Sequence, residues 1–204
     1  MLKIAALLIN AILVACELWT LGHIKKKWDI LRYYTYLQNL LALIASLIFC
    51  VCLVAELISG TPVTEFAKGC RYIATSGLAA TTFIFVVFLG AGKKAPMTQG
   101  DFSGGFSPKT ANLILHYICP ALSVVSFVAL EREIGLDSGF WTGIVAIPSC
   151  LYWVVYIILS VTKAWEEPYQ LESPEKKRPV LDSLQYVLMP LSFIVISFVL
   201  WNVK

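Results

Sequence analysis

The sequence predicts an all-α, polytopic integral membrane protein: a bundle of six transmembrane helices forming a single domain over residues 1–204. Its composition is the first reason, because 58% of the 204 residues are hydrophobic and 14% are charged, whereas soluble domains are roughly half apolar and a quarter charged. The second reason is a set of six apolar windows, each at or above the ~20 residues that a helix needs to cross a bilayer. These windows cover residues 2–23, 32–58, 69–92, 109–130, 139–163 and 181–202.

The first window contains the tetrapeptide Leu-Val-Ala-Cys at residues 13–16, which resembles the cleavage box of a lipoprotein signal peptide. A signal peptide carries its positive charge before the apolar segment. Here only Lys3 precedes the segment, and Lys25, Lys26 and Lys27 follow it. We therefore expect an uncleaved first helix.

Basic residues are distributed unevenly between the loops. The first, third and fifth loops hold eleven of the 16 Lys and Arg residues, and the termini with the second and fourth loops hold five, including Arg71 and Arg132. Because cytoplasmic loops carry the excess of Lys and Arg, we expect both termini outside and the odd-numbered loops in the cytoplasm. The sequence leaves open whether this is a bacterial inner membrane or a eukaryotic endomembrane or plasma membrane. The aromatic residues near window ends, which we expect at the membrane interfaces, are Trp19, Trp28, Tyr33, Tyr34, Trp141, Trp165 and Trp201.

Several kinds of partner are not indicated. The net charge of +3 is small and lies in short loops, so nucleic-acid binding is not expected. The six cysteines form no C-x-x-C pair and no paired histidines accompany them, so we expect no metal site and no cofactor. A disulfide among Cys50, Cys52 and Cys70, near the outer face, is compatible with the sequence but not required by it. The third loop, residues 90–109, is rich in Gly, Ser, Pro and Lys and is expected to be mobile, as a linker or a lid. The oligomeric state stays open.

The segment from Thr110 to Pro120 carries the chain's one deeply placed histidine, His116. Asn112 stands one turn before His116 on the same helix face. Pro120 has no N–H to give to the carbonyl four residues back, which is that of His116, so we expect the backbone to be loosened there. An ionisable residue at membrane depth is a candidate functional site, although a histidine that only hydrogen-bonds a neighbouring helix would look the same.

Other polar residues are expected at a similar depth. Helices two and four enter from the same side, and at ~1.5 Å per residue Thr35 and His116 lie roughly 5 and 10 Å deep. Gln38 and Asn39 share the face of Thr35, and Glu17 stands near the cytoplasmic end of helix one. Helix six begins with Asp182 and Gln185 in the same layer. The outer half of the chain shows no comparable concentration of polar residues.

These residue types permit nucleophilic attack by a hydroxyl that an imidazole activates, with Thr35 as nucleophile and His116 as base. The orienting residue is not fixed by the sequence. Glu17 could orient the imidazole, or Asn112 or Asn39 could orient it and donate to an oxyanion. Thr, Asn and Gln are also common interhelical hydrogen-bonding residues in membranes, so a purely structural role is the alternative for each.

Two motifs resemble a known family, the androgen-induced and androgen-dependent six-helix membrane threonine hydrolases of fatty acid esters of hydroxy fatty acids, with their bacterial relatives. In LRYYTYLQNLLALI, Thr35 stands where the family has its nucleophile, and in NLILHYICP the family's catalytic histidine corresponds to His116, with Asn112 four residues ahead. The 81-residue separation of Thr35 and His116 is also similar. Pro120 follows the histidine by four residues where human-like members have five, and the second loop is shorter than theirs. The resemblance implies a six-helix bundle with an internal Thr/His site.

The sequence thus favours a membrane hydrolase whose substrate is a lipid-like ester, with acyl chains between the helices and the scissile carbonyl near Thr35. Two alternatives remain. One is a non-catalytic lipid-binding or transport protein that uses the same polar pocket. The other is a structural or regulatory membrane protein in which the polar residues only join helices.

Overall fold

The structure is a computed structural model that describes residues 1–25, 33–88, 102–132, 136, 139–164 and 179–203, apart from the side chains of residues 160 and 179–186. The described residues are helical, and one isolated antiparallel bridge, Ile24 to Phe102, is the only strand-like pairing among them. The predicted all-α class is therefore confirmed. The helices are α1 (Leu2–Gly22), α2 (Tyr34–Ser59), α3 (Glu65–Val87), α4 (Pro108–Leu113), α5 (Cys119–Val125), α6 (Phe140–Ile144), α7 (Ile147–Val161) and α8 (Pro179–Val203), with π-helical segments η3 (Ile114–Ile118) and η4 (Ser126–Leu130).

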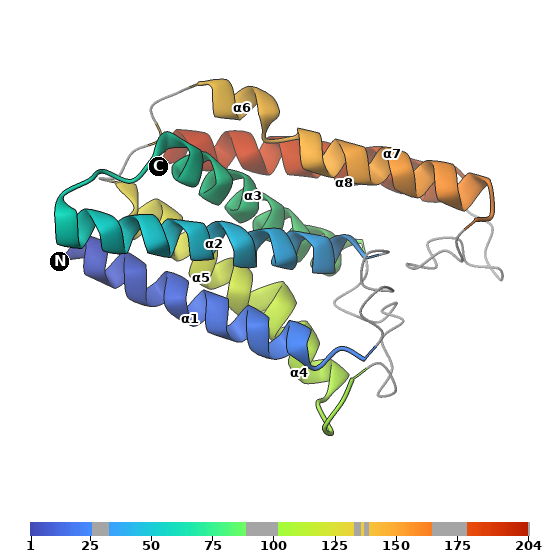
Figure 1. Ribbon diagram of the computed structural model, residues 1–204. Helices are drawn as coiled ribbons and strands as arrows, with labels where there is room; N and C mark the ends of the chain where they lie inside the picture. Colours follow the sequence, from blue (N-terminus) through green and yellow to red (C-terminus); the bar gives the residue numbers. More distant parts are fainter. Residues whose placement is uncertain (26–32, 89–101, 133–135, 137–138, 165–178, 204) are drawn as a thin grey trace.

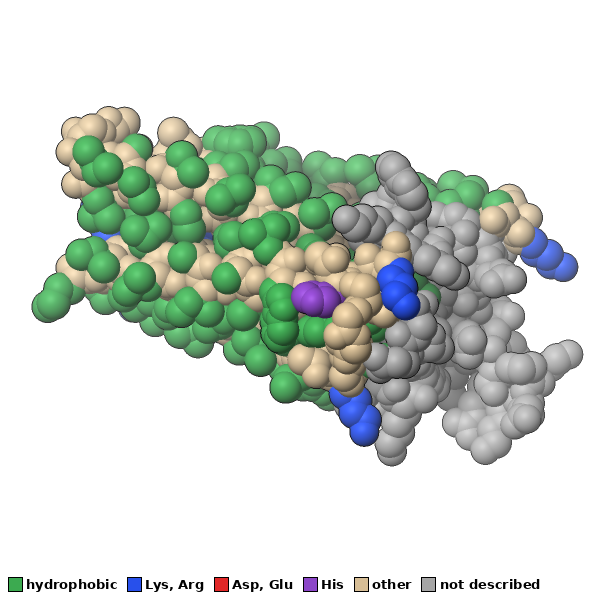
Figure 2. All heavy atoms as spheres, turned by 60° about the horizontal axis from the view of Figure 1, so that its bottom comes forward, with side chains coloured by type: hydrophobic (Ala, Val, Ile, Leu, Met, Phe, Trp, Pro, Cys, Tyr) green, Lys and Arg blue, Asp and Glu red, His purple; other side chains and the backbone are tan. Residues whose placement is uncertain are grey.

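Within the described ranges, five segments are long and apolar enough to cross a membrane: Leu2–Gly22, Tyr34–Ser59, Glu65–Val87, Pro108–Leu130 and Phe140–Leu159. The sixth predicted window coincides with α8, whose described apolar part, Val187–Val203, is shorter. Large apolar side chains such as Leu47 and Phe198 are exposed, and hydrophobic side chains cover much of the described surface in Figure 2. This surface suits a lipid environment, as an integral membrane protein requires.

Helix α3 is the central helix of the bundle and contacts α2, α5 and α8 (Figure 1). Its most apolar stretch is 61% buried, against 28% for the corresponding stretches of α1 and α2. Small residues make this position feasible, because they let neighbouring helices approach closely. Gly69 lies against the ring of Trp141 and Gly77 against the amide of Gln38, so a methyl group at either glycine would collide with that side chain.

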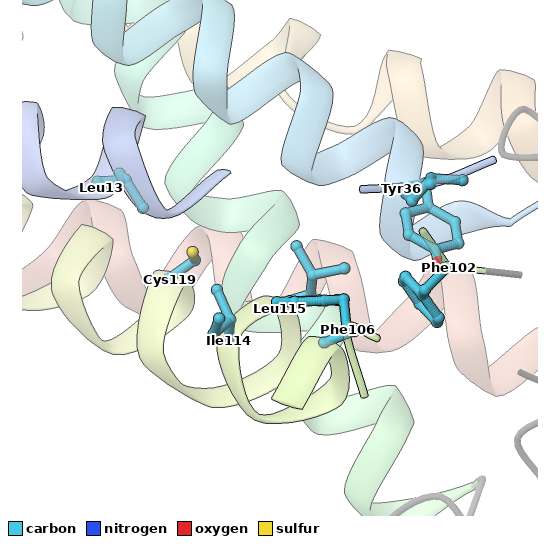
Figure 3. Packing of buried hydrophobic residues seen from close by; sticks show 9 residues of the cluster. Leu13, Tyr36, Phe102, Phe106, Ile114, Leu115 and Cys119 are labelled. Carbon is cyan, nitrogen blue, oxygen red and sulfur yellow. The ribbon is translucent and has the colours of Figure 1, made fainter. Parts of the chain in front are cut away.

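Both termini lie at the same end of the bundle in Figure 1. At the other end, the described part of the third loop, residues 102–107, packs against the end of α1. The rest of the segment that we expected to be mobile, residues 90–101, lies outside the described residues. The Ser103 backbone N–H and hydroxyl both donate to the His23 carbonyl, at 2.8 and 3.1 Å. Phe102 and Phe106 are 2% and 8% exposed and pack with residues of α1, α2 and η3 (Figure 3). The turn between them uses Gly104, whose φ of +63° favours glycine.

A buried ion pair joins the helices in the half of the bundle away from this loop. Arg71 Nη2 lies 2.9 Å from Glu131 Oε1, and the two side chains are 0% and 5% exposed. Glu131 also accepts from Ser126 Oγ at 2.7 Å and from Asn10 Nδ2 at 3.0 Å, and Arg71 Nη1 donates to Ser123 Oγ at 3.0 Å. The expectation that this half lacks a concentration of polar residues is therefore wrong. Arg71 belongs to the interior of α3 and not to a loop.

Replacing Glu131 by Gln should destabilise the protein strongly, because the Arg71 guanidinium would stay buried without its counter-charge. Breaking a buried ion pair from one side typically costs at least ~3 kcal/mol of the free energy of unfolding. Equilibrium unfolding in mixed micelles would measure the loss.

The matched control is Glu56→Gln, in the Lys3–Glu56 pair at 3.0 Å, whose side chains are 38% and 16% exposed. A pair so close to the surface should contribute less than ~1 kcal/mol. Equal losses in the two variants would contradict a special role for the Arg71–Glu131 pair.

Candidate functional site

Thr35 and His116 border one small buried cavity. Helices α2, α3, α7 and α8 and the π-helical segment η3 each contribute to its walls. The space has room for about one water-sized group. The residues that line the cavity are Tyr34, Thr35, Thr81, Ile84, Phe85, His116, Trp153 and Met189. The cavity is thus mostly apolar, with a few polar atoms directed at a small space.

Thr35 lies in the first turn of α2, which begins at Tyr34 after an extended residue, Tyr33, with φ −104° and ψ 122°. Its side chain is 8% exposed. Its carbonyl accepts a hydrogen bond from Asn39 Nδ2 at 2.8 Å, one turn further along the helix. The Thr35 hydroxyl makes no hydrogen bond to any other described residue. This hydroxyl is therefore available to a ligand.

The His116 ring is 3% exposed and is held by stacking on Phe85. The two ring centroids are 3.7 Å apart with an interplanar angle of 15°. Ring atom Nδ1 is buried and has no hydrogen-bond partner among the described residues. No hydrogen bond joins it to Thr35 there, so the two residues line one cavity without a direct hydrogen bond.

The backbone at His116 departs from a regular α-helix, as Pro120 predicts. Residues Ile114–Ile118 form a π-helical turn, in which the Cys119 N–H donates to the Ile114 carbonyl five residues back. The His116 carbonyl, which cannot receive an N–H from Pro120, accepts the Thr82 hydroxyl of α3 at 2.7 Å. Inside a bilayer such a carbonyl needs a partner within the protein. The Thr82 bond therefore anchors α3 to the histidine-bearing turn.

Asn39 and Gln38 lie next to the cavity rather than in it. Asn39 Nδ2 donates to the Thr35 carbonyl and, at 3.4 Å, to the Leu115 carbonyl, so it connects α2 to η3 through backbone atoms. Gln38 packs against Gly77 of α3. The side-chain carbonyl oxygens of Gln38 and Asn39 are buried without a partner among the described residues. Asn39 thus joins the elements that carry Thr35 and His116, and Gln38 packs α2 against α3.

Glu17 and Asn112 do not line the cavity. Glu17 is fully buried in α1, and neither of its carboxyl oxygens has a partner among the described residues. The side-chain oxygen of Asn112 is likewise unpartnered in that part of the chain. In this structure neither residue, nor Asn39, hydrogen-bonds to the His116 ring, so none of the expected orienting contacts is formed. The side chains of Asp182 and Gln185 lie outside the described residues.

Five lining residues were missed by sequence reasoning, namely Thr81, Ile84, Phe85, Trp153 and Met189. Phe85 and Met189 carry no signal that distinguishes them from ordinary apolar residues. Trp153 lies in the middle of the fifth apolar window, away from the interfaces where Trp is usual, and this place is a usable signal. Tyr34 was expected at the interface, but it is 2% exposed and its hydroxyl lies 2.7 Å from Ser149 Oγ of α7.

No family model, curated protein or solved structure matches the chain. The role of the cavity therefore follows from its own chemistry. A threonine and a histidine line a mostly apolar space, and their hydroxyl and imidazole are the pair of groups that acyl transfer through a covalent intermediate uses. All six cysteines are free, and no group of three His, Cys, Asp or Glu side chains in the described part of the chain could hold a metal ion.

Replacing Thr82 by Val should destabilise the protein, because the His116 carbonyl would lose its side-chain donor and Pro120 offers no N–H in its place. The expected loss is roughly 1–3 kcal/mol in the free energy of unfolding, the usual range for an orphaned buried polar group. Equilibrium unfolding in mixed micelles would measure it.

Two further variants test the cause. In a Pro120→Ala background, the backbone N–H gained at position 120 can serve the carbonyl, so Thr82→Val should cost less than half as much there. Thr20→Val is the control, because the Thr20 hydroxyl donates to the Cys16 carbonyl of a regular helix, which already has a backbone partner. The same loss with and without Pro120 would reject the explanation.

Proposed function

We propose that this protein is an intramembrane hydrolase of lipid esters, with Thr35 as nucleophile and His116 as general base. One observation carries the proposal: a hydroxyl and an imidazole from separate helices border the same buried cavity. Neither the Thr35 hydroxyl nor His116 Nδ1 is committed to another described group. Buried polar groups without partners are uncommon and are expected where a ligand or water supplies the missing bond.

The proposed reaction has two halves. The Thr35 oxygen attacks the ester carbonyl carbon while His116 takes the hydroxyl proton, and the carbonyl π electrons move to the oxygen. The tetrahedral intermediate collapses, the bond to the leaving alcohol breaks, and His116 returns its proton to that alcohol. Water then attacks the acyl-threonine with His116 again as base, which releases the fatty acid and restores the Thr35 hydroxyl.

The surroundings support a lipid ester as substrate. The cavity walls include Ile84, Phe85 and Met189, and the outer surface of the helices is apolar. The resemblance at Thr35 and His116 favours fatty acid esters of hydroxy fatty acids. We place the site in a six-span bundle with both termini outside and the odd-numbered loops in the cytoplasm, where the fatty acid would be released.

A non-catalytic lipid-binding or transport protein is the second candidate. It is favoured by the lack of a Thr35–His116 hydrogen bond and of an orienting carboxylate among the described residues. This candidate predicts lipid binding that survives Thr35→Ser and His116→Gln. A lipid-ester turnover assay beside the binding assay separates the two, because the hydrolase loses turnover in His116→Gln.

Thr35→Ala should abolish covalent labelling by a fluorophosphonate probe and hydrolysis of lipid esters, because the remaining lining hydroxyls, those of Thr81 and Tyr34, are engaged in hydrogen bonds. His116→Gln should reduce both by at least about 100-fold, since general-base catalysis contributes 10²–10⁴-fold. Gel fluorescence of the labelled protein and release of fatty acid would measure the two effects.

The control is Thr20→Ala, which removes a buried hydroxyl in α1 that does not line the cavity. This variant should label and hydrolyse as the wild type does. Labelling that persists in Thr35→Ala would reject Thr35 as the nucleophile.

A further inference from the structure

The hydrogen-bonding groups that border the cavity fall into two sets. Two hydroxyls are already engaged: Thr81 Oγ donates to the Gly77 carbonyl at 2.8 Å, and the Tyr34 hydroxyl pairs with Ser149. Three groups have no hydrogen bond to another described residue: the Thr35 hydroxyl, His116 Nδ1 and the indole N–H of Trp153. The indole N–H of Trp153 has no role in the reaction proposed above.

The indole N–H of Trp153 can only donate. The side chain is 3% exposed, and atom Nε1 is buried without a partner among the described residues. A buried donor left unsatisfied costs roughly 1–3 kcal/mol, and a phenylalanine would avoid that cost. Buried tryptophans usually find an acceptor for this N–H. We therefore expect the acceptor for this N–H to be supplied by something other than the described residues.

Aromatic neighbours fix the orientation of the indole. The Trp153 ring lies 5.8 Å from the ring of Tyr34, 5.3 Å from that of Tyr152 and 5.2 Å from that of Tyr156, measured between centroids. All four residues belong to one buried cluster. A donor held this way does not need to reorganise when charge develops on an acceptor, which is the property that makes an oxyanion donor effective.

We propose that the Trp153 indole N–H donates to the carbonyl oxygen of the bound ester and to the oxyanion that forms when Thr35 attacks. The inference rests on the proposed hydrolase function and adds the electrophilic partner that Thr35 and His116 lack. Thr35, His116 and Trp153 all line the same water-sized space. A carbonyl oxygen in that space would accept from the indole while its carbon faces the threonine.

The charges around the cavity define the class of substrate further. None of the described residues that line it is Lys, Arg, Asp or Glu. An anionic headgroup such as a phosphate would enter this apolar space without a counter-charge, at a high desolvation cost. A neutral carbonyl needs only the one donor. The substrate at this site is therefore an uncharged acyl ester, and any charged part of the lipid lies away from the cavity.

The test compares Trp153→Phe with the wild type in the hydrolysis of a neutral fatty acid ester. The variant keeps an aromatic ring and removes the N–H, so kcat should fall about 100-fold with little change in KM, as for loss of one oxyanion donor. Trp141→Phe is the control, because Trp141 is a buried indole outside the cavity. It should hydrolyse at the wild-type rate. Equal rates in Trp153→Phe and the wild type would overturn the inference.

A substrate change tests the same bond without relying on the folding of a variant. In a thionoester, sulfur replaces the carbonyl oxygen and accepts hydrogen bonds weakly. The wild type should hydrolyse the oxygen ester faster than the thionoester, by a ratio of rates well above the ratio found in alkaline hydrolysis. Trp153→Phe should show only the ratio found in alkaline hydrolysis. No extra preference in the wild type would overturn the inference. If Thr35→Ala hydrolyses the ester as the wild type does, the proposed function itself fails, and the two failures stay distinguishable.

Discussion

The absence of an N–H on Pro120 explains how the histidine side of the cavity is built. Pro120 leaves the His116 carbonyl without its helical donor, and the interior of a bilayer offers no water in exchange. The Thr82 hydroxyl takes that place at 2.7 Å. Phe85, one turn further along α3, then stacks on the imidazole. The same face of α3 thus satisfies the backbone of the histidine and fixes its ring, so the local break in the fourth helix and the position of His116 have one cause.

The two polar regions of the bundle are built differently. In one, the charges of Arg71 and Glu131 face each other and are surrounded by hydroxyl and amide donors, which is what a structural cluster needs at this depth. In the other, Thr35, His116 and Trp153 line one space, and their polar side-chain groups do not bond one another. Unpartnered polar atoms also occur elsewhere among the described residues, but only here do several belong to residues that line one cavity, so we propose that a ligand completes this second region.

Hydropathy and helix periodicity predict the helices and the break at Pro120 because both depend on local chemistry. They fail for Arg71, since its place at the edge of the window at residues 69–92 made it count with the loop, whereas α3 begins at Glu65 and buries it against an acid 60 residues away. They also fail for Glu17 and Asn112. Spacing places these residues on a helix face, but the rotation of that face relative to His116 depends on how the helices pack. Tyr34 shows the same limit, because an aromatic residue at a window end looks interfacial until α7 covers it.

The size of the cavity bears on the order of events in the proposed reaction. Space for about one water-sized group leaves no room for the leaving alcohol and an attacking water at the same position beside His116. Direct attack by water on the ester would need both at once. A covalent acyl-threonine avoids this conflict, because the alcohol departs before water enters and the two share one position in turn. Under the proposed function, a nucleophile supplied by the protein therefore suits so confined and apolar a site, and Thr35 is the lining hydroxyl that has no hydrogen bond to another described residue.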